Sequence, residues 1–374
     1  MSRSLISRRP RFGRGASVSD AKPAPSALQC LGWKPFFQQQ LTLEELSDSE
    51  PVRVMAVHRS QLDVSGESGD EPLPLALLPR ELETEQRPTV GDWLLLARES
   101  RRPQRMLERS SLFQRMAPGA SRSQLIAANI DSVLMVSSCN DDFNLSRIER
   151  YLALVREAGC RACLVLTRMD QCDDTSVYTD ALRDHGDLPL AMVNALDADS
   201  VAPLRDWCAA GETVALLGSS GVGKSTLLNT LSDSERAATA GIREDDSKGR
   251  HTTRHRALYP LPDGGLLLDS PGMRELGLAN VAQGLAATFD DIGRLAEDCR
   301  FSDCRHESEP GCTVRAALES GELDERRLRN WRKLKREMAR NNRTLAEQRA
   351  GDRALGQFYR AVQSHARSRK QCGD

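Results

Sequence analysis

The chain has 374 residues, 39% of them hydrophobic, which is enough for two or three domains with buried cores. The sequence has no apolar run long enough to cross a bilayer and no secretory signal at its start, which excludes the membrane-spanning and secreted classes. Its ten cysteines lack the regular spacing of a disulfide scaffold, so we expect a soluble protein of the reducing cytoplasm.

The net charge of −1 is unevenly distributed. Residues 325–374 contain 15 Lys and Arg against 5 Asp and Glu, which leaves −11 on residues 1–324. A basic end on an otherwise acidic chain favours a polyanionic partner that is contacted there. The alternative is the solvated surface of a plain amphipathic helix pair.

Residues 1–50 are interpreted as a basic arm and linker. The opening, MSRSLISRRPRFGRG, is rich in Arg and Ser and has no acid before Asp20. Organellar transit peptides share this composition, but a disordered arm is the interpretation that we adopt. Further on, Leu31-Gly32-Trp33 and Phe36-Phe37 form an apolar patch, which we expect to pack onto a neighbouring domain.

Short apolar runs separated by turn residues characterise the next segment, residues 51–115. The runs are VRVMAV at 52–57, PLALLP at 74–79, DWLLLAR at 92–98 and QRMLER at 104–109, with a turn-rich stretch at 65–70. This pattern of short apolar runs and turns predicts a small antiparallel barrel, and five short strands in the span would suit an OB-fold.

Strands and helices alternate in residues 116–277. The expected strands are SVLMVS at 132–137, ACLVLT at 162–167, PLAMVNA at 189–195 and TVALLG at 213–218, with helices near 145–158 and 177–184. Strands this apolar are typical of a parallel sheet that is covered on both faces. Residues 278–374 complete the α/β fold as a helical module with a Cys/His cluster and a basic tail.

An apolar strand, a Gly-rich turn and an apolar-periodic helix follow one another in TVALLGSSGVGKSTLLNTL, which is the context of a phosphate-binding loop. Backbone N–H groups would wrap the phosphates, Lys224 would reach the β and γ phosphates, and Ser225 would bind Mg²⁺. The predicted nucleotide-binding residues of this segment are Gly218, Ser219, Ser220, Gly221, Val222, Gly223, Lys224, Ser225 and Thr226.

Two further polar segments follow the phosphate loop. The buried strand before Asp269 leads to Gly272, so we expect Asp269 to hold Mg²⁺ and the Gly272 amide to contact the γ phosphate. Between the loop and this strand lies KGRHTTRH at 248–255, where a switch loop would supply a hydroxyl to Mg²⁺. Thr253 is the preferred donor and Thr252 the second choice, whereas the alternative is an exposed polar loop.

Guanine recognition needs an Asp after a buried strand, because a carboxylate accepts both N1–H and N2–H of guanine and adenine cannot match it. Asp170, in Thr167-Arg168-Met169-Asp170, meets this requirement, and Asn194-Ala195 would supply a second loop at guanine O6. Both segments precede the phosphate loop, whereas ordinary GTPases have them after it. The order therefore indicates a circularly permuted GTPase.

Three thiols and one imidazole lie within fourteen residues near the C-terminus, at Cys299, Cys304, His306 and Cys312. This set suits one closed, tetrahedral, structural Zn²⁺ site with no open position for catalysis. The other close cysteine pair, Cys160 and Cys163, has no second pair and enters a buried strand, so we interpret it as core packing.

Barrel, permuted GTPase and Cys/Cys/His/Cys module in this order resemble the small-subunit-dependent ribosomal GTPases of the RsgA, or YjeQ, family over about residues 28–340. The specific marks are the permuted order, GRHTT at 249–253, DSPGMRE at 269–275 and the cysteine spacing. The resemblance implies a GTPase that acts in late maturation of the 30S small ribosomal subunit and whose hydrolysis the subunit stimulates.

The resemblance also implies how the site works. Met273 stands where many GTPases have a Gln that orients the attacking water, and the family instead points to His251, with Thr253 and Lys224 completing the catalytic set. A group of the ribosome or a non-catalytic loop His are the alternatives for His251. The family's Asn-Lys-x-Asp and Ser-Ala loops are replaced here by Thr167-Arg168-Met169-Asp170 and Asn194-Ala195, and Arg and Lys are not interchangeable.

The expected partners are GTP or GDP with Mg²⁺, and the 30S subunit with its 16S rRNA, which the barrel and zinc module would bind by phosphate contacts and shape. We expect a monomer that contacts no membrane. A different class of function is an RNA-binding assembly factor that holds nucleotide without turning it over. An ATPase is disfavoured by Asp170.

Overall fold

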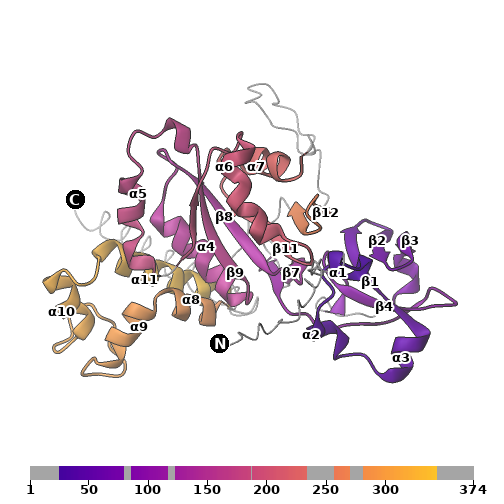
Figure 1. The fold of residues 1–374 in the computed structure, drawn as a ribbon. Helices are drawn as coiled ribbons and strands as arrows, with labels where there is room; N and C mark the ends of the chain where they lie inside the picture. Colours follow the sequence, from indigo (N-terminus) through magenta and orange to yellow (C-terminus); the bar gives the residue numbers. More distant parts are fainter. Residues whose placement is uncertain are drawn as a thin grey trace, which may run out of the picture.

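The computed structural model describes residues 25–79, 86–116, 123–186, 188–233, 257–269 and 281–342. A small β domain, a central α/β domain and a group of C-terminal helices lie side by side, in that order (Figure 1). The central sheet and its permuted arrangement confirm the predicted fold class.

Five strands with antiparallel pairing form the N-terminal β domain, in the order β5-β4-β1-β2-β3. Their bounds are Ser49–Val57 for β1, Gln61–Gly66 for β2, Gly69–Pro74 for β3, Trp93–Ala97 for β4 and Pro103–Met106 for β5. Alternate residues of β1, Val52 and Val54, enter a core with Leu62, Val64 and Leu94. The number of strands agrees with the prediction, although one of the predicted runs is not among them.

One predicted strand, at 74–79, is wrong. The chain forms a 3₁₀ turn, η1, at Leu75–Leu77, and the strand β3 ends at Pro74. Pro74 and Pro79 lack the N–H group that a sheet ladder needs, and Leu77 is 42% exposed, so this apolar run gains little from pairing as a strand.

Three short helices precede the β domain: α1 at Ala27–Cys30, α2 at Pro35–Gln38 and α3 at Leu43–Asp48. Trp33 and Phe37 pack onto β4, with the Trp33 ring edge-on to Trp93 at 4.8 Å between centroids. Phe37 shares a buried cluster with Trp93 and Leu95. The prediction that this patch packs onto a neighbouring domain is confirmed.

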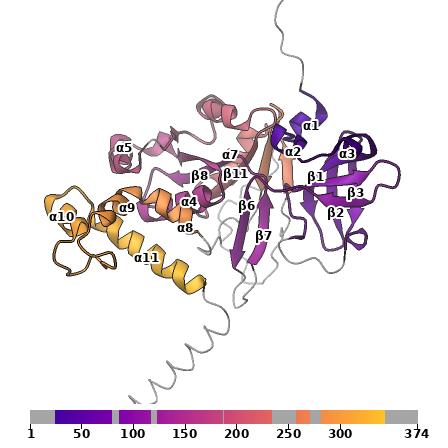
Figure 2. The same ribbon diagram turned by 90° about the horizontal axis from the view of Figure 1, so that it is seen from below.

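The central domain is built on the parallel strands β10-β9-β8-β11-β13, with β12 antiparallel beside β13. The strands are β8 Ser132–Ser138, β9 Arg161–Thr167, β10 Leu190–Met192, β11 Thr213–Gly218, β12 Ala257–Pro260 and β13 Leu266–Asp269. A separate hairpin joins β6, Leu112–Met116, to β7, Ser123–Ala128 (Figure 2).

Helices and 3₁₀ turns connect the parallel strands. They are α4 Leu145–Glu157, η3 Met169–Gln171, α5 Ser176–Ala181, η4 Arg183–His185, α6 Ala198–Val201, η5 Ala202–Cys208 and α7 Lys224–Leu231. Buried side chains lie on both faces of the sheet and divide into two clusters, one of which extends to the C-terminal helices. Both predicted helices of this region, near 145–158 and 177–184, are observed.

Arg53 joins the β domain to the central sheet. Its side chain is almost fully buried and donates to the Thr213 hydroxyl and the Asn129 carbonyl, both at 2.8 Å, and to the carbonyls of Leu31 and Gly91. Burial lowers the pKa of Arg53 to about 10, and the guanidinium remains charged at neutral pH. One side chain thus holds four chain segments together.

The C-terminal helices are α8 Ala282–Thr288, α9 Asp290–Glu297, α10 Thr313–Ser320 and α11 Glu325–Asn341. Of these, α8 and α11 pack against α4, while α9 contacts α8 and α10. Gly284 permits close packing of α8 on α4, because a Cβ there would lie 2.0 Å from the Ala153 carbonyl oxygen. Across the described residues, no helix combines the length and apolar character needed to span a membrane.

Candidate nucleotide and metal sites

Several predicted site residues come to one edge of the central sheet. Strands β8 to β11 and β13 run parallel, so their carboxyl ends, where such sheets bind ligands, lie at the same edge. Gly218 ends β11, Thr167 ends β9 and Asp269 ends β13. Residues that are up to about a hundred positions apart in the chain therefore lie along the same edge of the sheet.

The predicted phosphate loop is a tight turn into a helix. Gly221 and Gly223 have φ angles of 82° and 90°, the left-handed region that glycine adopts without strain. Gly218 is required for another reason, because a Cβ there would lie 2.2 Å from the Val136 carbonyl oxygen. The loop ends at Gly223, which is the N-cap of α7, so Lys224 and Ser225 begin the helix.

Lys224 folds back over this loop. Its Nζ donates to the carbonyl oxygen of Gly218 at 2.8 Å and also to that of Ser219. The ammonium therefore lies beside the backbone of the loop, where a phosphate chain would need positive charge.

The predicted base loop is bonded to the phosphate loop. The Thr167 hydroxyl is buried and donates to the Val222 carbonyl at 2.7 Å, while Arg168 Nη2 donates to the Gly221 carbonyl at 3.0 Å. Arg168 has a φ of 59°, and this turn places Met169 and Asp170 in an exposed 3₁₀ turn beyond the sheet edge. Thr167 and Arg168, which stand where the family has Asn and Lys, thus make hydrogen bonds that connect the base loop to the phosphate loop.

The second predicted base segment lies next to the first. Met169 N–H donates to the Val193 carbonyl, directly before Asn194. The Asn194 side chain accepts from the Leu196 N–H at 3.0 Å, and the Ala195 carbonyl accepts from Thr230 of α7. The segment at 194–195 is therefore fixed both to the base loop and to the helix that follows the phosphate loop.

Asp269 is the last residue of β13, and its backbone pairs with Ala257 of β12. The other predicted residues of the switch segments, His251, Thr252, Thr253 and Gly272, lie outside the described residues, as do Met273, the basic arm before residue 25 and the tail after residue 342.

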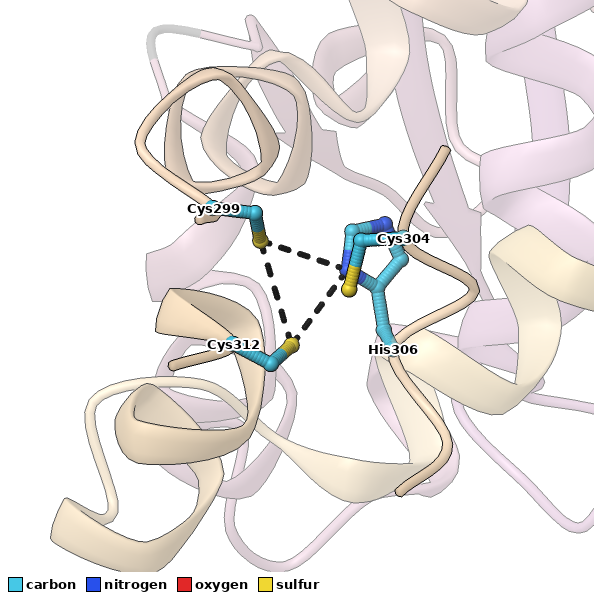
Figure 3. A group of neighbouring side chains, drawn as sticks. All are labelled: Cys299, Cys304, His306 and Cys312. Atoms are coloured by element: carbon cyan, nitrogen blue, oxygen red, sulfur yellow. Dashed lines mark hydrogen bonds between the residues drawn. The ribbon is translucent and has the colours of Figure 1, made fainter. Parts of the chain in front are cut away.

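The four predicted metal ligands, Cys299, Cys304, His306 and Cys312, come together between α9 and α10 (Figure 3). Their ligand atoms lie within 4.8 Å of one another, with 3.8 Å between the sulfurs of Cys299 and Cys312 and 3.5 Å from Cys312 Sγ to His306 Nδ1. Ligands at about 2.3 Å for sulfur and about 2.0 Å for nitrogen are separated by roughly 3.5–3.8 Å in a tetrahedron. The cluster can thus hold one metal ion.

The surroundings favour the metal-binding form of His306 and Cys299, whereas desolvation raises the pKa of the Cys304 thiol to about 11. Burial lowers the pKa of His306, and the charges of Arg332 and Lys335 lower it further, which favours the neutral imidazole that binds metals. Burial opposes ionisation of Cys299, but the N–H groups of Val314 and Thr313 at the start of α10 outweigh it and lower the pKa of this thiol. Cys160 and Cys163 are buried in the core, where burial raises the pKa of both thiols.

Two arginines with evident structural roles carry no local sequence signal. Arg147 contacts the phosphate loop from α4, 72 positions before Ser219, and Arg53 bonds to residue 213. An arginine in an amphipathic helix or an alternating strand predicts a solvated side chain, and only the tertiary fold gives either residue its partners.

Comparison with known proteins agrees with this geometry. The family model described as RsgA GTPase matches residues 106–279. A Small ribosomal subunit biogenesis GTPase RsgA 2 from Vibrio parahaemolyticus is 49% identical over 347 residues, covering 92% of this chain and 95% of that protein. The RsgA of Mesorhizobium japonicum is 43% identical and covers 84% of this chain and 91% of that protein.

Solved structures share the fold. The crystal structure of YjeQ from Thermotoga maritima matches with a TM-score of 0.56 at 24% identity, covering 76% of this chain and 97% of that one. The structure of YloQ, described as a circularly permuted GTPase, matches with a TM-score of 0.55 at 23% identity, covering 79% of this chain and 97% of that one.

Proposed function

The chain belongs to the RsgA family of small ribosomal subunit biogenesis GTPases, and we propose that its GTP site is the sheet edge between the phosphate loop and the base loop. One observation carries this proposal: Thr167 and Arg168 bond directly to Val222 and Gly221. These contacts join a phosphate-binding turn to a guanine-reading turn, although the chain order of the two is reversed relative to ordinary GTPases.

In this proposal the phosphates bind to the N–H groups of residues 218–226 at the start of α7. Lys224 leaves the carbonyls of Gly218 and Ser219 and contacts the β and γ phosphates. Ser225, Asp269 and Thr253 hold Mg²⁺, which when bound neutralises charge that develops on the phosphates. The Gly272 amide contacts the γ phosphate.

The base binds at the loops that follow β9 and β10. The Asp170 carboxylate accepts the two guanine N–H groups, and Asn194-Ala195 contacts O6. The Thr167–Val222 contact sets the distance from base to phosphates, while Arg168 lies along the phosphate loop. The observed Arg168–Gly221 bond supports the view that this arginine keeps the base loop in a binding position.

Hydrolysis needs a group that orients the attacking water, and the proposed residue is His251 with Thr253 and Lys224. The thioether of Met273 cannot perform this task. We therefore expect slow intrinsic turnover that the 30S subunit accelerates during its late maturation in the cytoplasm.

The metal cluster is proposed to hold one structural Zn²⁺, since thiolates and imidazole suit zinc and four protein ligands leave no open position. The β domain at 51–115 and the zinc module at 278–374 would contact 16S rRNA from either side of the GTPase domain at 116–277, and the protein would act as a monomer. The basic helix α11 supports a phosphate-rich partner, because its 17 residues include Arg329, Lys333 and Arg336.

Phosphate release from GTP, measured with and without purified small subunits, tests the proposal. Stimulated release is the expected result. Tight GTP binding without any release in either condition would instead favour the nucleotide-bound assembly factor. Competition between GTP and ATP in the same assay decides between a GTPase and an ATPase.

A further inference from the structure

Arg147, in the first turn of α4, contacts the phosphate loop from its side. Its Nη1 donates to the Ser219 hydroxyl at 2.5 Å and to the Asp142 carboxylate at 2.7 Å. Ser219 is the second residue of the loop, and its carbonyl accepts from Lys224. One loop residue is thus held by two cations, through its hydroxyl on one side and its carbonyl on the other.

The turn that carries Arg147 is fixed to the C-terminal helix. Asn330 of α11 donates to the Ser146 carbonyl. Arg150 forms a bidentate ion pair with Glu337 of α11, in which both N–O distances are 2.7 Å. Glu149, fully buried, bonds to Arg326, Arg327 and Asn330. Arg147 therefore projects toward the loop from a helix whose neighbouring residues are held in place.

We propose that Arg147 is a positioning residue for the nucleotide, which holds the first part of the phosphate loop in its binding conformation through Ser219. The inference rests on the proposed function, because it assigns the loop to phosphate binding. A loop with three glycines has much conformational freedom to lose on binding, and a charge-assisted hydrogen bond that restricts it beforehand increases affinity. The effect acts equally on GDP and GTP, since both use this part of the loop.

Titration of the full chain with a fluorescent GDP analogue tests the inference. Arg147→Met and Ser219→Ala should each raise Kd about tenfold, as expected for one charged hydrogen bond. The Kd of the double variant for the GDP analogue should not exceed the higher Kd of the two single variants, because both changes remove the same contact. Arg156→Met is the matched control: it lies near the end of α4, bonds to the Ala287 carbonyl rather than the loop, and should stay within about twofold of wild type.

Steady-state GTP hydrolysis supplies the second measurement. Chemistry in a slow GTPase is slower than nucleotide release, so KM follows Kd, and Arg147→Met should raise KM about tenfold with kcat unchanged. A merely structural role would lower the melting temperature and leave the KM of the folded protein unaltered. Unchanged Kd in Arg147→Met, additive effects in the double variant, or an equal loss in Arg156→Met would each overturn the inference.

Failure of the inference and failure of the proposed function give different results. GDP binding requires no hydrolysis, so Arg147 dependence of Kd in a protein that never releases phosphate would contradict only the proposed function. Conversely, stimulated hydrolysis by a wild type whose Kd does not depend on Arg147 would contradict only the inference.

Discussion

Replacement of Glu149 by Gln would test the polar contact that fixes α11 to the GTPase domain. Glu149 is fully buried, and it accepts hydrogen bonds from His185, Arg326 and Arg327. Burial alone would raise its pKa, but the bonds from His185 and Arg326 outweigh burial and hold the pKa at about 2. Relative to its usual value of 4.5, this corresponds to roughly 3 kcal/mol of stability at neutral pH.

The Gln side chain has the size of Glu but no charge. Its NH₂ group, itself a hydrogen-bond donor, would face the donors of Arg326 and Arg327. We expect Glu149→Gln to lower the free energy of unfolding by roughly 3 kcal/mol and the melting temperature by about 6–12 °C in calorimetry at pH 7.5. The matched control is Glu337→Gln, which breaks the partly exposed Arg150 pair and should cost less than about 1 kcal/mol.

The pH dependence of stability follows from the direction in which the pKa of Glu149 is shifted, which is downward. A carboxyl whose folded pKa is depressed contributes stability above pH 4.5 and loses it as pH falls toward 2. Wild type should therefore lose more stability than Glu149→Gln between pH 5 and the lowest pH at which it remains folded. Equal melting temperatures of wild type and variant at pH 7.5 would refute the reasoning.

Four further changes have defined outcomes. Lys224→Ala should abolish GTP binding in titration calorimetry, because it removes the ammonium beside the phosphate loop; normal turnover would disprove that role. Asp170→Asn should weaken GTP and improve xanthosine triphosphate binding, since an amide can donate to the xanthine oxygen, and an unchanged preference would remove Asp170 as the base reader. Cys304→Ser, like chelation, should lower metal content and co-sedimentation with small subunits while GDP binding persists. Arg53→Met should lower the free energy of unfolding by roughly 2–4 kcal/mol in urea titration, because four acceptors lose their donor; a variant as stable as wild type would contradict this.

Much of the fold could be predicted because its signals are local. The strands at 132–137, 162–167 and 213–218 are apolar runs of the kind typical of a doubly covered parallel sheet, and each is present. The run at 74–79 has the same apolar texture, yet its prolines and its exposure make it a 3₁₀ turn. Apolar composition alone cannot distinguish these cases without the pairing partners.

The candidate site, like the fold, could be predicted from the sequence only in part. Motif spacing predicted a phosphate loop, and the expected turn into a helix is present, and it predicted the Cys/His cluster, whose ligand atoms lie close together. The consequences of Thr167 and Arg168 could not be read from the sequence, because their hydrogen bonds reach Val222 and Gly221, more than fifty residues later. Arg147 was missed for the same reason, since its partner Ser219 becomes a neighbour only when α4 packs on β8 and β9 of the sheet.

A crystal structure with Mg²⁺ and a non-hydrolysable GTP analogue tests the proposed GTP site most directly. Guanine should lie within hydrogen-bonding distance of the Asp170 carboxylate, and the β and γ phosphates should lie on Lys224 Nζ and the N–H groups at the start of α7. Phosphates bound at the loop with the base away from Asp170, or a nucleotide bound elsewhere, would contradict the claim that these two loops form one GTP site.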